Sequence, residues 1–227
     1  VENALRWVEK TQQITLSVEQ REAIRVGVTA KVMVITGGPG TGKTTVIKSL
    51  LAILEKKGLS FLLAAPTGRA AKRMEAATGR DARTIHRLLE YSPKTGDFQR
   101  NENNPLVTDL VVIDETSMVD TPMMHSLLKA IPPFGRLILV GDVDQLPSVG
   151  PGNVLFDIIA SQVLPVVRLK TVFRQAARSG IIANAHLVNE GKYPAFNDTD
   201  FFLIERHDPT RALEAVLELV VRRIPAK

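Results

Sequence analysis

Short runs rich in Val, Ile and Leu alternate along the chain with longer segments of amphipathic, helix-compatible character. Continuous apolar runs of this kind are typical of strands that are covered on both faces of a parallel sheet. The predicted strands are Val32–Thr36, Phe61–Ala65, Leu110–Asp114, Leu137–Gly141, Val163–Leu169 and, from a weaker pattern, Phe201–Ile204. Because strands and helices alternate, we expect an α/β fold: a doubly wound parallel sheet with helices on both faces and a ligand at the carboxyl ends of the strands.

Local signals predict where some helices begin. Thr121 and Asp208 each precede a proline, which predicts a capping side chain followed by proline at the first helical position. Ser17 and Gln20 have the spacing of a capping box, which predicts another helix start. The polar segment Tyr91–Pro105 breaks the alternation and predicts a hairpin or loop inserted into the fold.

Composition limits the class of protein. At 227 residues and 44% hydrophobic content, the chain can bury one substantial core. It has no cysteine, which excludes disulfides and thiolate metal sites and fits a reducing interior, so we expect a cytoplasmic protein. No apolar run approaches the ~18 residues that span a bilayer, so no membrane partner is expected. The net charge of +5 permits an anionic partner without requiring one.

The segment Gly37–Thr44 has the pattern Gly-x4-Gly-Lys-Thr and lies between a predicted strand and a helix-compatible run. Its glycines let the backbone approach a triphosphate, and the helix N-terminus adds a partial positive charge. Lys43 would reach the β- and γ-phosphates, while the Thr44 hydroxyl would ligate Mg²⁺. We therefore expect a bound nucleoside triphosphate, held by Gly38, Pro39, Gly40, Thr41, Gly42, Lys43, Thr44 and Thr45.

Polar residues also follow two later strands. Asp114 would hold Mg²⁺ through its hydration shell, and Glu115 would orient and deprotonate the attacking water. Because a kinase does not need such a base, the pair favours hydrolysis. The amide of Gln145, after the next strand, could contact both the water and the γ-phosphate, but the turn-forming residues around it equally predict a plain turn.

Five motifs follow one another in a fixed order: Gly37–Thr44, Ala65–Ala71, Val112–Met118, Gly141–Pro147 and Val172–Gln175. Together they resemble the ordered motifs of superfamily 1 DNA helicases, most closely the RecD-like branch with its exodeoxyribonuclease V alpha subunits and TraA-type proteins. The resemblance covers roughly residues 16 to 193 and implies a RecA-like P-loop NTPase fold. It also implies the motor domain of an ATP-dependent DNA helicase, which uses ATP and Mg²⁺ to translocate on single-stranded DNA in recombination and repair.

The resemblance implies roles for single residues in the nucleotide site. Gln145 would sense the γ-phosphate and couple hydrolysis to DNA. Arg174 would be an arginine finger that neutralises charge in the transition state, worth about 10³-fold or more in rate. Gln20 matches the adenine-reading glutamine of the family, whose amide can pair with N6 and N7 of adenine. Because Gln20 is also part of the capping box, both interpretations stay open, and both roles can hold together.

A basic segment between Pro66 and Arg87 is the candidate DNA contact. Its strand end and helix could hold phosphates, although a merely solvated helical face is equally compatible with the composition. The resemblance favours DNA binding by Pro66, Thr67, Arg69, Arg73, Thr84 and His86, with a structural role for His86 as the alternative. Because only 5% of the residues are aromatic, we expect contacts to the DNA backbone rather than base stacking.

Three parts of the chain are expected. Residues 1–16 would be the end of a preceding segment, residues 17–180 the first RecA-like ATPase domain with a small insertion at 91–105, and residues 181–227 the connection and start of an incomplete second RecA-like domain. In RecD-like enzymes a hairpin that splits the duplex occupies the place of the insertion. Here the insertion is either such a wedge, with Phe98 as the only apolar candidate for its tip, or a plain loop.

The expected activity depends on what accompanies this chain. It begins with Val1, and its last residues lie within an element, so we expect a piece of a longer protein. Since a helicase closes two RecA-like domains around ATP, we expect the chain alone to bind ATP and Mg²⁺ but not to unwind DNA. Translocation from 5′ to 3′, and other subunits of a helicase–nuclease complex as partners, are implied by the resemblance alone.

Two other classes of protein compete with this interpretation. A nucleotide kinase or GTPase is disfavoured, because the chain has no Asn-Lys-x-Asp guanine-reading motif and because Glu115 and Gln145 indicate hydrolysis. The alternative is an ATP-gated DNA- or protein-binding module without unwinding activity. Stimulation of hydrolysis by single-stranded DNA would distinguish a motor domain from that module.

Overall fold

The computed structural model describes residues 1–173, 179–197 and 199–224 of the 227 residues. The chain divides after residue 177 into two compact units. The first unit holds all five motifs, and it is described first. Arg174, the predicted arginine finger, lies outside the described residues.

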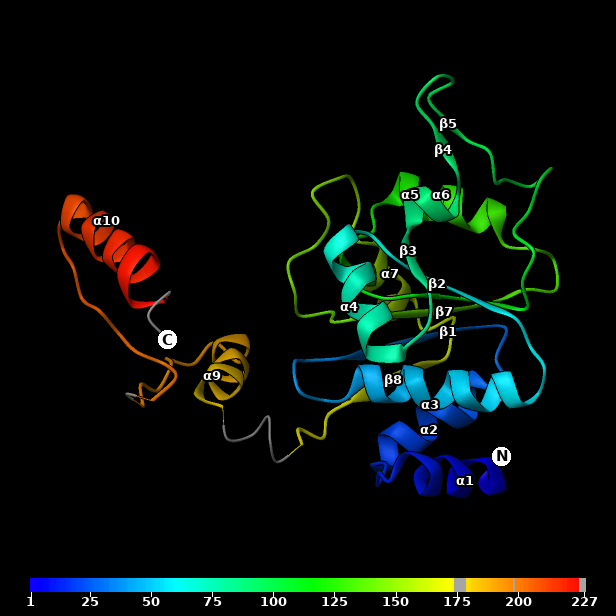
Figure 1. Cartoon of the computed structure of the whole chain (residues 1–227), viewed down its shortest axis with the longest axis horizontal. Helices are drawn as coiled ribbons and strands as arrows, with labels where there is room; N and C mark the ends of the chain where they lie inside the picture. The colour runs from blue at the N-terminus through cyan, green and yellow to red at the C-terminus, as the bar shows by residue number, and fades with distance from the viewer. Residues whose placement is uncertain (174–178, 198, 225–227) are drawn as a thin grey trace. The chain divides into compact units, whose positions relative to one another are not determined.

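A six-stranded parallel sheet is the centre of the first unit (Figure 1). Its strands pair in the order β3-β2-β6-β7-β1-β8. Each strand is connected to the next one along the chain by a crossover that contains a helix. The strands are β1 (Val32–Gly37), β2 (Phe61–Ala65), β3 (Ala82–Thr84), β6 (Leu110–Ile113), β7 (Arg136–Gly141) and β8 (Val166–Leu169). Because all pairings are parallel, the carboxyl ends of these strands lie along one edge of the sheet.

Helices cover both faces of the sheet, which confirms the predicted doubly wound fold (Figure 1). Successive side chains of β1 point to opposite faces: Met33 and Ile35 pack against one core cluster, and Val34 packs in the other. One face is covered by α1 (Glu2–Gln12), α2 (Val18–Gly27), α3 (Lys43–Lys56) and α4 (Gly68–Thr78). The other is covered by α5 (Ile85–Leu88), α6 (Thr121–Ala130) and α7 (Val154–Ser161).

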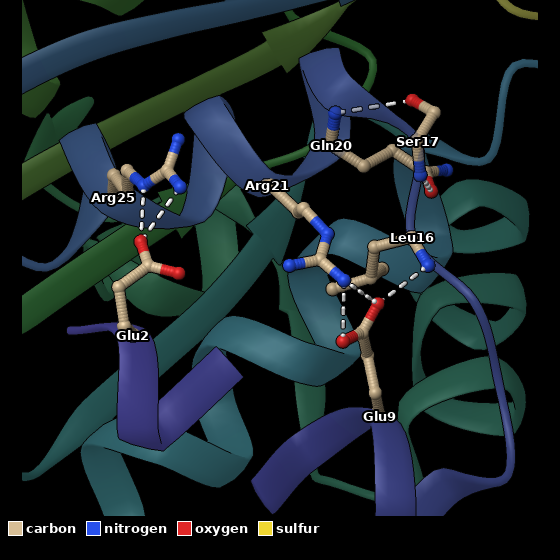
Figure 2. A network of polar contacts seen from close by, with 7 residues as sticks. All are labelled: Glu2, Glu9, Leu16, Ser17, Gln20, Arg21 and Arg25. Carbon is tan, nitrogen blue, oxygen red and sulfur yellow. Dashed lines mark hydrogen bonds and ion pairs between the residues drawn. The ribbon is translucent and has the colours of Figure 1, made fainter. Parts of the chain in front are cut away.

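The N-terminal helix α1 is part of the same core. Leu5 and Val8 are fully buried in the cluster that α3 also lines. On its outer side, α1 is tied to α2 by two ion pairs, Glu9 with Arg21 at 2.7 Å and Glu2 with Arg25 at 2.6 Å (Figure 2). That residues 1–16 end a preceding segment stays a prediction, and their helix packs in the same core cluster as α3.

Four of the six predicted strands, β1, β2, β6 and β7, match the sheet within one residue, and the other two predictions differ from it. The strand expected at Val163–Leu169 begins only at Val166, where its pairing with β1 starts, and Val163 is 79% exposed. The strand expected at Phe201–Ile204 is wrong: these residues form no regular structure, and Phe202, Leu203 and Ile204 are exposed. β3 was not predicted, because its three residues, Ala82–Thr84, carry little strand pattern of their own.

Two of the predicted helix caps are confirmed and one is wrong. Ser17 and Gln20 form the complete capping box at the start of α2. Asp208 accepts hydrogen bonds from the amides of Thr210 and Arg211 and caps α10 (Pro209–Glu218). Thr121, however, is the first residue of α6 rather than its cap. Asp120 is the cap, because its carboxylate accepts a hydrogen bond from the Met123 amide at 2.8 Å.

The inserted segment is a hairpin. Tyr91–Ser92 (β4) pairs antiparallel with Asp97–Phe98 (β5), and Gly96, at φ 71°, lies in the turn between them. Figure 1 shows the two strands projecting beyond α5 and α6. Phe98 does not lie at the tip: it is paired with Tyr91 and packs against the core cluster of α5 and α6, so the tip is polar.

The second unit contains α9 (Gly180–Asn189), α10 and η2 (Leu219–Arg223). Asn184 is 2% exposed, and its amide exchanges two hydrogen bonds with the backbone of Ala195, which fixes the chain after α9. That this unit begins a second RecA-like domain remains a prediction. Over the described ranges of both units, no helix combines the length and apolar character needed to cross a membrane.

Candidate nucleotide and nucleic-acid site

The predicted functional residues gather at the carboxyl edge of the sheet because their strands are neighbours. β1 leads into the phosphate loop, β6 into Asp114 and Glu115, and β7 into the turn that holds Gln145. β6 lies between β2 and β7, and β7 lies between β6 and β1, so these three strand ends are adjacent. On the other side, β2 and β3 lead into the residues predicted to bind DNA.

The phosphate loop has the backbone that its glycines predict. Gly40 and Gly42 have φ values of 78° and 80°, in the left-handed region that residues with a Cβ rarely adopt. The Thr41 hydroxyl donates to the Gly38 carbonyl at 2.8 Å and is 2% exposed, so it braces the loop from inside. The Lys43 ammonium donates hydrogen bonds to the carbonyl groups of Gly37 and Gly38, so its side chain folds over the loop. The phosphates of a nucleotide would lie against the same loop.

Gln20 connects helix α2 to this loop. Its side chain is buried, its carbonyl accepts from the Ser17 amide at 3.1 Å, and its Nε2 donates to the Thr41 carbonyl at 3.2 Å. The cap therefore uses the side-chain amide itself (Figure 2). An amide has two acceptor and two donor positions, so one of each remains for an adenine ring.

Asp114 has the surroundings of a magnesium-binding carboxylate. It is 9% exposed, and its Oδ1 accepts from the Glu115 amide at 2.9 Å. Burial raises the pKa of Asp114, and the charge of Glu115 adds to this, whereas the hydrogen bond from the Glu115 amide and the charges of Lys43 and Arg73 lower it. A buried carboxylate, which is costly to ionise alone, is stabilised by a cation. Thr44, the exposed second residue of α3, offers a hydroxyl, so the oxygen donors fit Mg²⁺.

Glu115 is held in an unusual backbone conformation. Its φ of 53° and ψ of 41° are left-handed, and it precedes the short helix η1 (Thr116–Met118). The other non-glycine residues with positive φ, including Gln13 and Gln162, lie at or just after helix ends. Oε1 of Glu115 accepts from Arg73, and Oε2 is buried without a hydrogen-bond partner among the described residues. A free buried carboxylate oxygen is what a base that binds a water requires.

Gln145 lies on a turn after β7, and its side chain is exposed. Its backbone amide donates to the Asp142 carbonyl at 3.2 Å, and its Nε2 lies 3.4 Å from Asp142 Oδ2. Asp142 is 3% exposed and also accepts from the Asp144 amide. The two interpretations of Gln145 are thus compatible, because the turn exists and presents the amide at the same edge as the phosphate loop. Asp142, which anchors it, was not among the predicted site residues.

The last motif approaches the phosphate loop from β8. The Phe173 amide donates to the Gly40 carbonyl at 3.3 Å, and its ring lies beside Gly42. Phe173 is the last described residue before Arg174, so the role of Arg174 rests on the motif alone.

The residues predicted to bind DNA lie on two neighbouring strand ends. Thr67 caps α4 by accepting from the Ala70 amide, and Thr84 caps α5 by accepting from the Arg87 amide, both at 3.2 Å. Pro66 precedes the first cap, and Arg69 and Arg73 are exposed on α4. Of these residues, Arg73 is the one that also touches the nucleotide side, through Glu115.

His86 belongs to an aromatic group that the composition did not predict. Its ring centroid lies 5.8 Å from that of Tyr91 and 5.7 Å from that of Phe98, and the two hairpin rings are 5.3 Å apart. His86 and Tyr91 are exposed. The three rings come from α5, β4 and β5, so the signal for this group is the hairpin pairing rather than any run of aromatic residues.

The chain is similar in sequence to the following helicases and helicase subunits. The family model described as "AAA domain" matches residues 20–151. The chain is 43% identical to the ATP-dependent RecD2 DNA helicase of Deinococcus radiodurans over 87% of its length and 27% of that protein. It is 43% identical to the RecBCD enzyme subunit RecD of Mycolicibacterium smegmatis, over 74% of this chain and 35% of the subunit.

A solved structure supports the fold. The crystal structure of the Pif1 helicase from Candida albicans superimposes with a TM-score of 0.59, at 24% identity, over 80% of this chain and 45% of that one. The chain thus spans about a quarter to a third of the length of the two relatives above.

Proposed function

Because the chain belongs to the AAA domain family and, within it, to the RecD-like group of superfamily 1, we propose that it is the ATPase motor domain of an ATP-dependent DNA helicase. One observation carries the proposal. The phosphate loop, the Asp114–Glu115 pair and Gln145 follow three adjacent strands, β1, β6 and β7, and the DNA-binding candidates follow the next two. The nucleotide and the DNA would therefore bind along one edge of one sheet.

In this proposal each residue of the nucleotide site has a separate role. Lys43 exchanges the loop carbonyls for the β- and γ-phosphates, and Gln20 uses its remaining donor and acceptor for adenine. Thr44 and Asp114 would hold Mg²⁺, which neutralises charge on the phosphates. Glu115 orients a water with its free Oε2 and accepts its proton, and Gln145 contacts the γ-phosphate.

DNA binding is assigned to the ends of β2 and β3. The N-terminus of α4, with its Thr67 cap and Arg69, offers amide groups and positive charge to a phosphate, and Thr84 and His86 continue that surface from the neighbouring strand. Single-stranded DNA is the expected partner. The RecBCD subunit names of several relatives suggest further protein subunits as partners of the longer protein.

ATP hydrolysis by this chain, measured with and without an oligo(dT) strand, tests the proposal. We expect Lys43→Ala to abolish ATP binding, and Glu115→Gln to keep binding but lower turnover by roughly 10²-fold or more, as loss of a general base does. Lys48→Ala, an exposed change further along α3, is the matched control and should behave like the wild type. Hydrolysis that survives both site variants would refute the proposed site.

Strand separation is a separate question from hydrolysis. A helicase works by opening and closing two motor domains, and here we expect a single one to bind ATP and DNA without unwinding a duplex. Processive unwinding of a forked duplex by the 227-residue chain would contradict this expectation. ATP binding without any turnover would favour the alternative, a module in which ATP only gates binding to DNA or protein.

A further inference from the structure

A residue of the DNA surface contacts the proposed catalytic base. Arg73 Nη2, on α4, donates to Glu115 Oε1. The Arg73 side chain is 68% exposed, whereas that of Glu115 is 13% exposed. The ion pair thus joins the outer surface of α4 to the interior of the nucleotide site.

Glu115 has few other restraints on its carboxylate. Its backbone is fixed, because its amide donates to Asp114 Oδ1 and its carbonyl accepts from Met118 at 3.0 Å. Its Oε2 has no partner in the described part of the chain, so Arg73 alone sets the direction of the carboxylate there. The ion pair therefore holds the carboxylate in one orientation, and its loss would let the Glu115 side chain turn.

Arg73 also belongs to a basic face. Lys72 and Arg73 follow Arg69 by three and four positions on α4, and all three are exposed, while Ala70, Ala71 and Met74 are buried. The helix starts at the Thr67 cap, where a phosphate would bind. A phosphate that reaches this face therefore meets the guanidinium that holds Glu115, and phosphate and carboxylate compete for the same donors.

We propose that Arg73 is a positioning residue that restrains Glu115 while no DNA is bound, and that a DNA phosphate on α4 takes over Arg73 and releases Glu115 for hydrolysis. This inference rests on the proposed function and adds the route by which DNA stimulates it. Linkage makes the effect reciprocal: if DNA frees Glu115 from Arg73, Glu115 weakens DNA binding by the same factor.

The reciprocal effect can be measured without any hydrolysis. The affinity for a fluorescent oligo(dT) strand is measured by anisotropy, in the absence of nucleotide, for the wild type, Glu115→Gln, Arg73→Gln and the double variant. We expect Glu115→Gln to tighten binding about two- to fivefold, a small factor because Arg73 is mostly exposed. In the Arg73→Gln background the Glu115→Gln change should have no effect. Glu75→Gln, an exposed acid on the same helix, controls for the loss of one negative charge.

Hydrolysis gives a second readout that a merely structural role would not move. Arg73→Gln should raise the DNA-free rate of ATP hydrolysis and lower the ratio of DNA-stimulated to DNA-free rates, and Arg73→Lys should restore part of that ratio. Lys57→Gln removes an exposed positive charge beyond α3 and should leave both rates unchanged.

The outcomes separate the two levels of the proposal. If oligo(dT) binds but Glu115→Gln tightens binding equally with and without Arg73, or if Arg73→Gln lowers the DNA-free rate, the restraint by Arg73 is refuted and the proposed function stands. If the wild type does not bind oligo(dT), the DNA half of the proposed function fails and the inference fails with it. If the wild type binds oligo(dT) but does not hydrolyse ATP, the oligo(dT) affinities of the wild type and the three variants alone test the restraint by Arg73.

Discussion

Replacement of Gly42 by alanine tests how tightly Gln20 and the phosphate loop depend on each other. Gly42 has a φ of 80°, and a Cβ added there would overlap Nε2 of Gln20. The substitution therefore combines two costs: a left-handed conformation for a residue with a side chain, and displacement of the amide that bonds Ser17 and Thr41.

The magnitudes follow from these two costs. The left-handed conformation costs about 1–2 kcal/mol for a residue with a Cβ. Each of the two Gln20 hydrogen bonds contributes about 0.5–1.5 kcal/mol. We expect Gly42→Ala to lower the free energy of unfolding by about 2–5 kcal/mol, and to weaken ATP binding because the loop amides are moved. Since about 1 kcal/mol shifts Tm by about 2–4 °C at this chain length, the expected drop in Tm is roughly 4–20 °C.

Gly58→Ala is the matched control. Gly58 has nearly the same conformation, at φ 72°, but a Cβ there would meet nothing within 4 Å. It should therefore show only the conformational cost, about 1–2 kcal/mol, and normal ATP affinity. Thermal unfolding and titration with a fluorescent ATP analogue measure both effects. Equal losses of stability and unchanged ATP binding in the two variants would refute the coupling between Gln20 and the loop.

Two further predictions concern the core and the metal site. Leu5→Ala, in the fully buried part of α1, should lower the free energy of unfolding by about 2–5 kcal/mol, measured in urea melts followed by the fluorescence of Trp7. Val18→Ala, at an 81% exposed position, is the control and should change the free energy of unfolding little. Equally small effects of the two substitutions would mean that α1 is not part of the core. Because the pKa of Asp114 is raised by burial, the folded state holds its proton to higher pH than the unfolded chain does, so its contribution to stability falls as pH rises from about 4 through the raised pKa. Asp114→Asn should remove that fall in the free energy of unfolding, measured by metal-free urea melts across this pH range, and should weaken binding of ATP with Mg²⁺. If the difference in unfolding free energy between the wild type and the variant does not vary with pH, the direction of the pKa shift is contradicted.

The parts of the fold that the sequence predicted are those that depend on local pattern. β1, β2, β6 and β7 were found within one residue of their ends, because each is a continuous apolar run that the sheet buries on both faces. The segment at Phe201–Ile204 has a similar apolar composition but no strand, because an apolar run becomes a strand only where a partner pairs with it. β3 shows the reverse: Ala82–Thr84 has a weak pattern and becomes a strand through its pairing with β2.

The candidate site divides in the same way. The phosphate loop and the Asp114–Glu115 pair could be predicted because their chemistry is contained in short motifs next to strands. The contact between Arg73 and Glu115 could not, since the two residues are 42 positions apart and meet only because β2 and β6 are neighbours. The rings of His86, Tyr91 and Phe98 likewise meet only through the pairing of the hairpin.

The strand order places the candidate nucleotide residues and the candidate DNA-binding residues close together. Asp114 N donates to the carbonyl of Ala64, so the β6 end that carries the two candidate carboxylates is bonded directly to the β2 end that leads into Pro66 and Thr67. With this register, the first turns of α4 lie beside Glu115, and a basic residue on α4 can reach it without any long-range relay. The coupling proposed for Arg73 is therefore a consequence of placing α4, the candidate DNA-binding helix, immediately after β2, the neighbour of the strand that leads into Asp114 and Glu115.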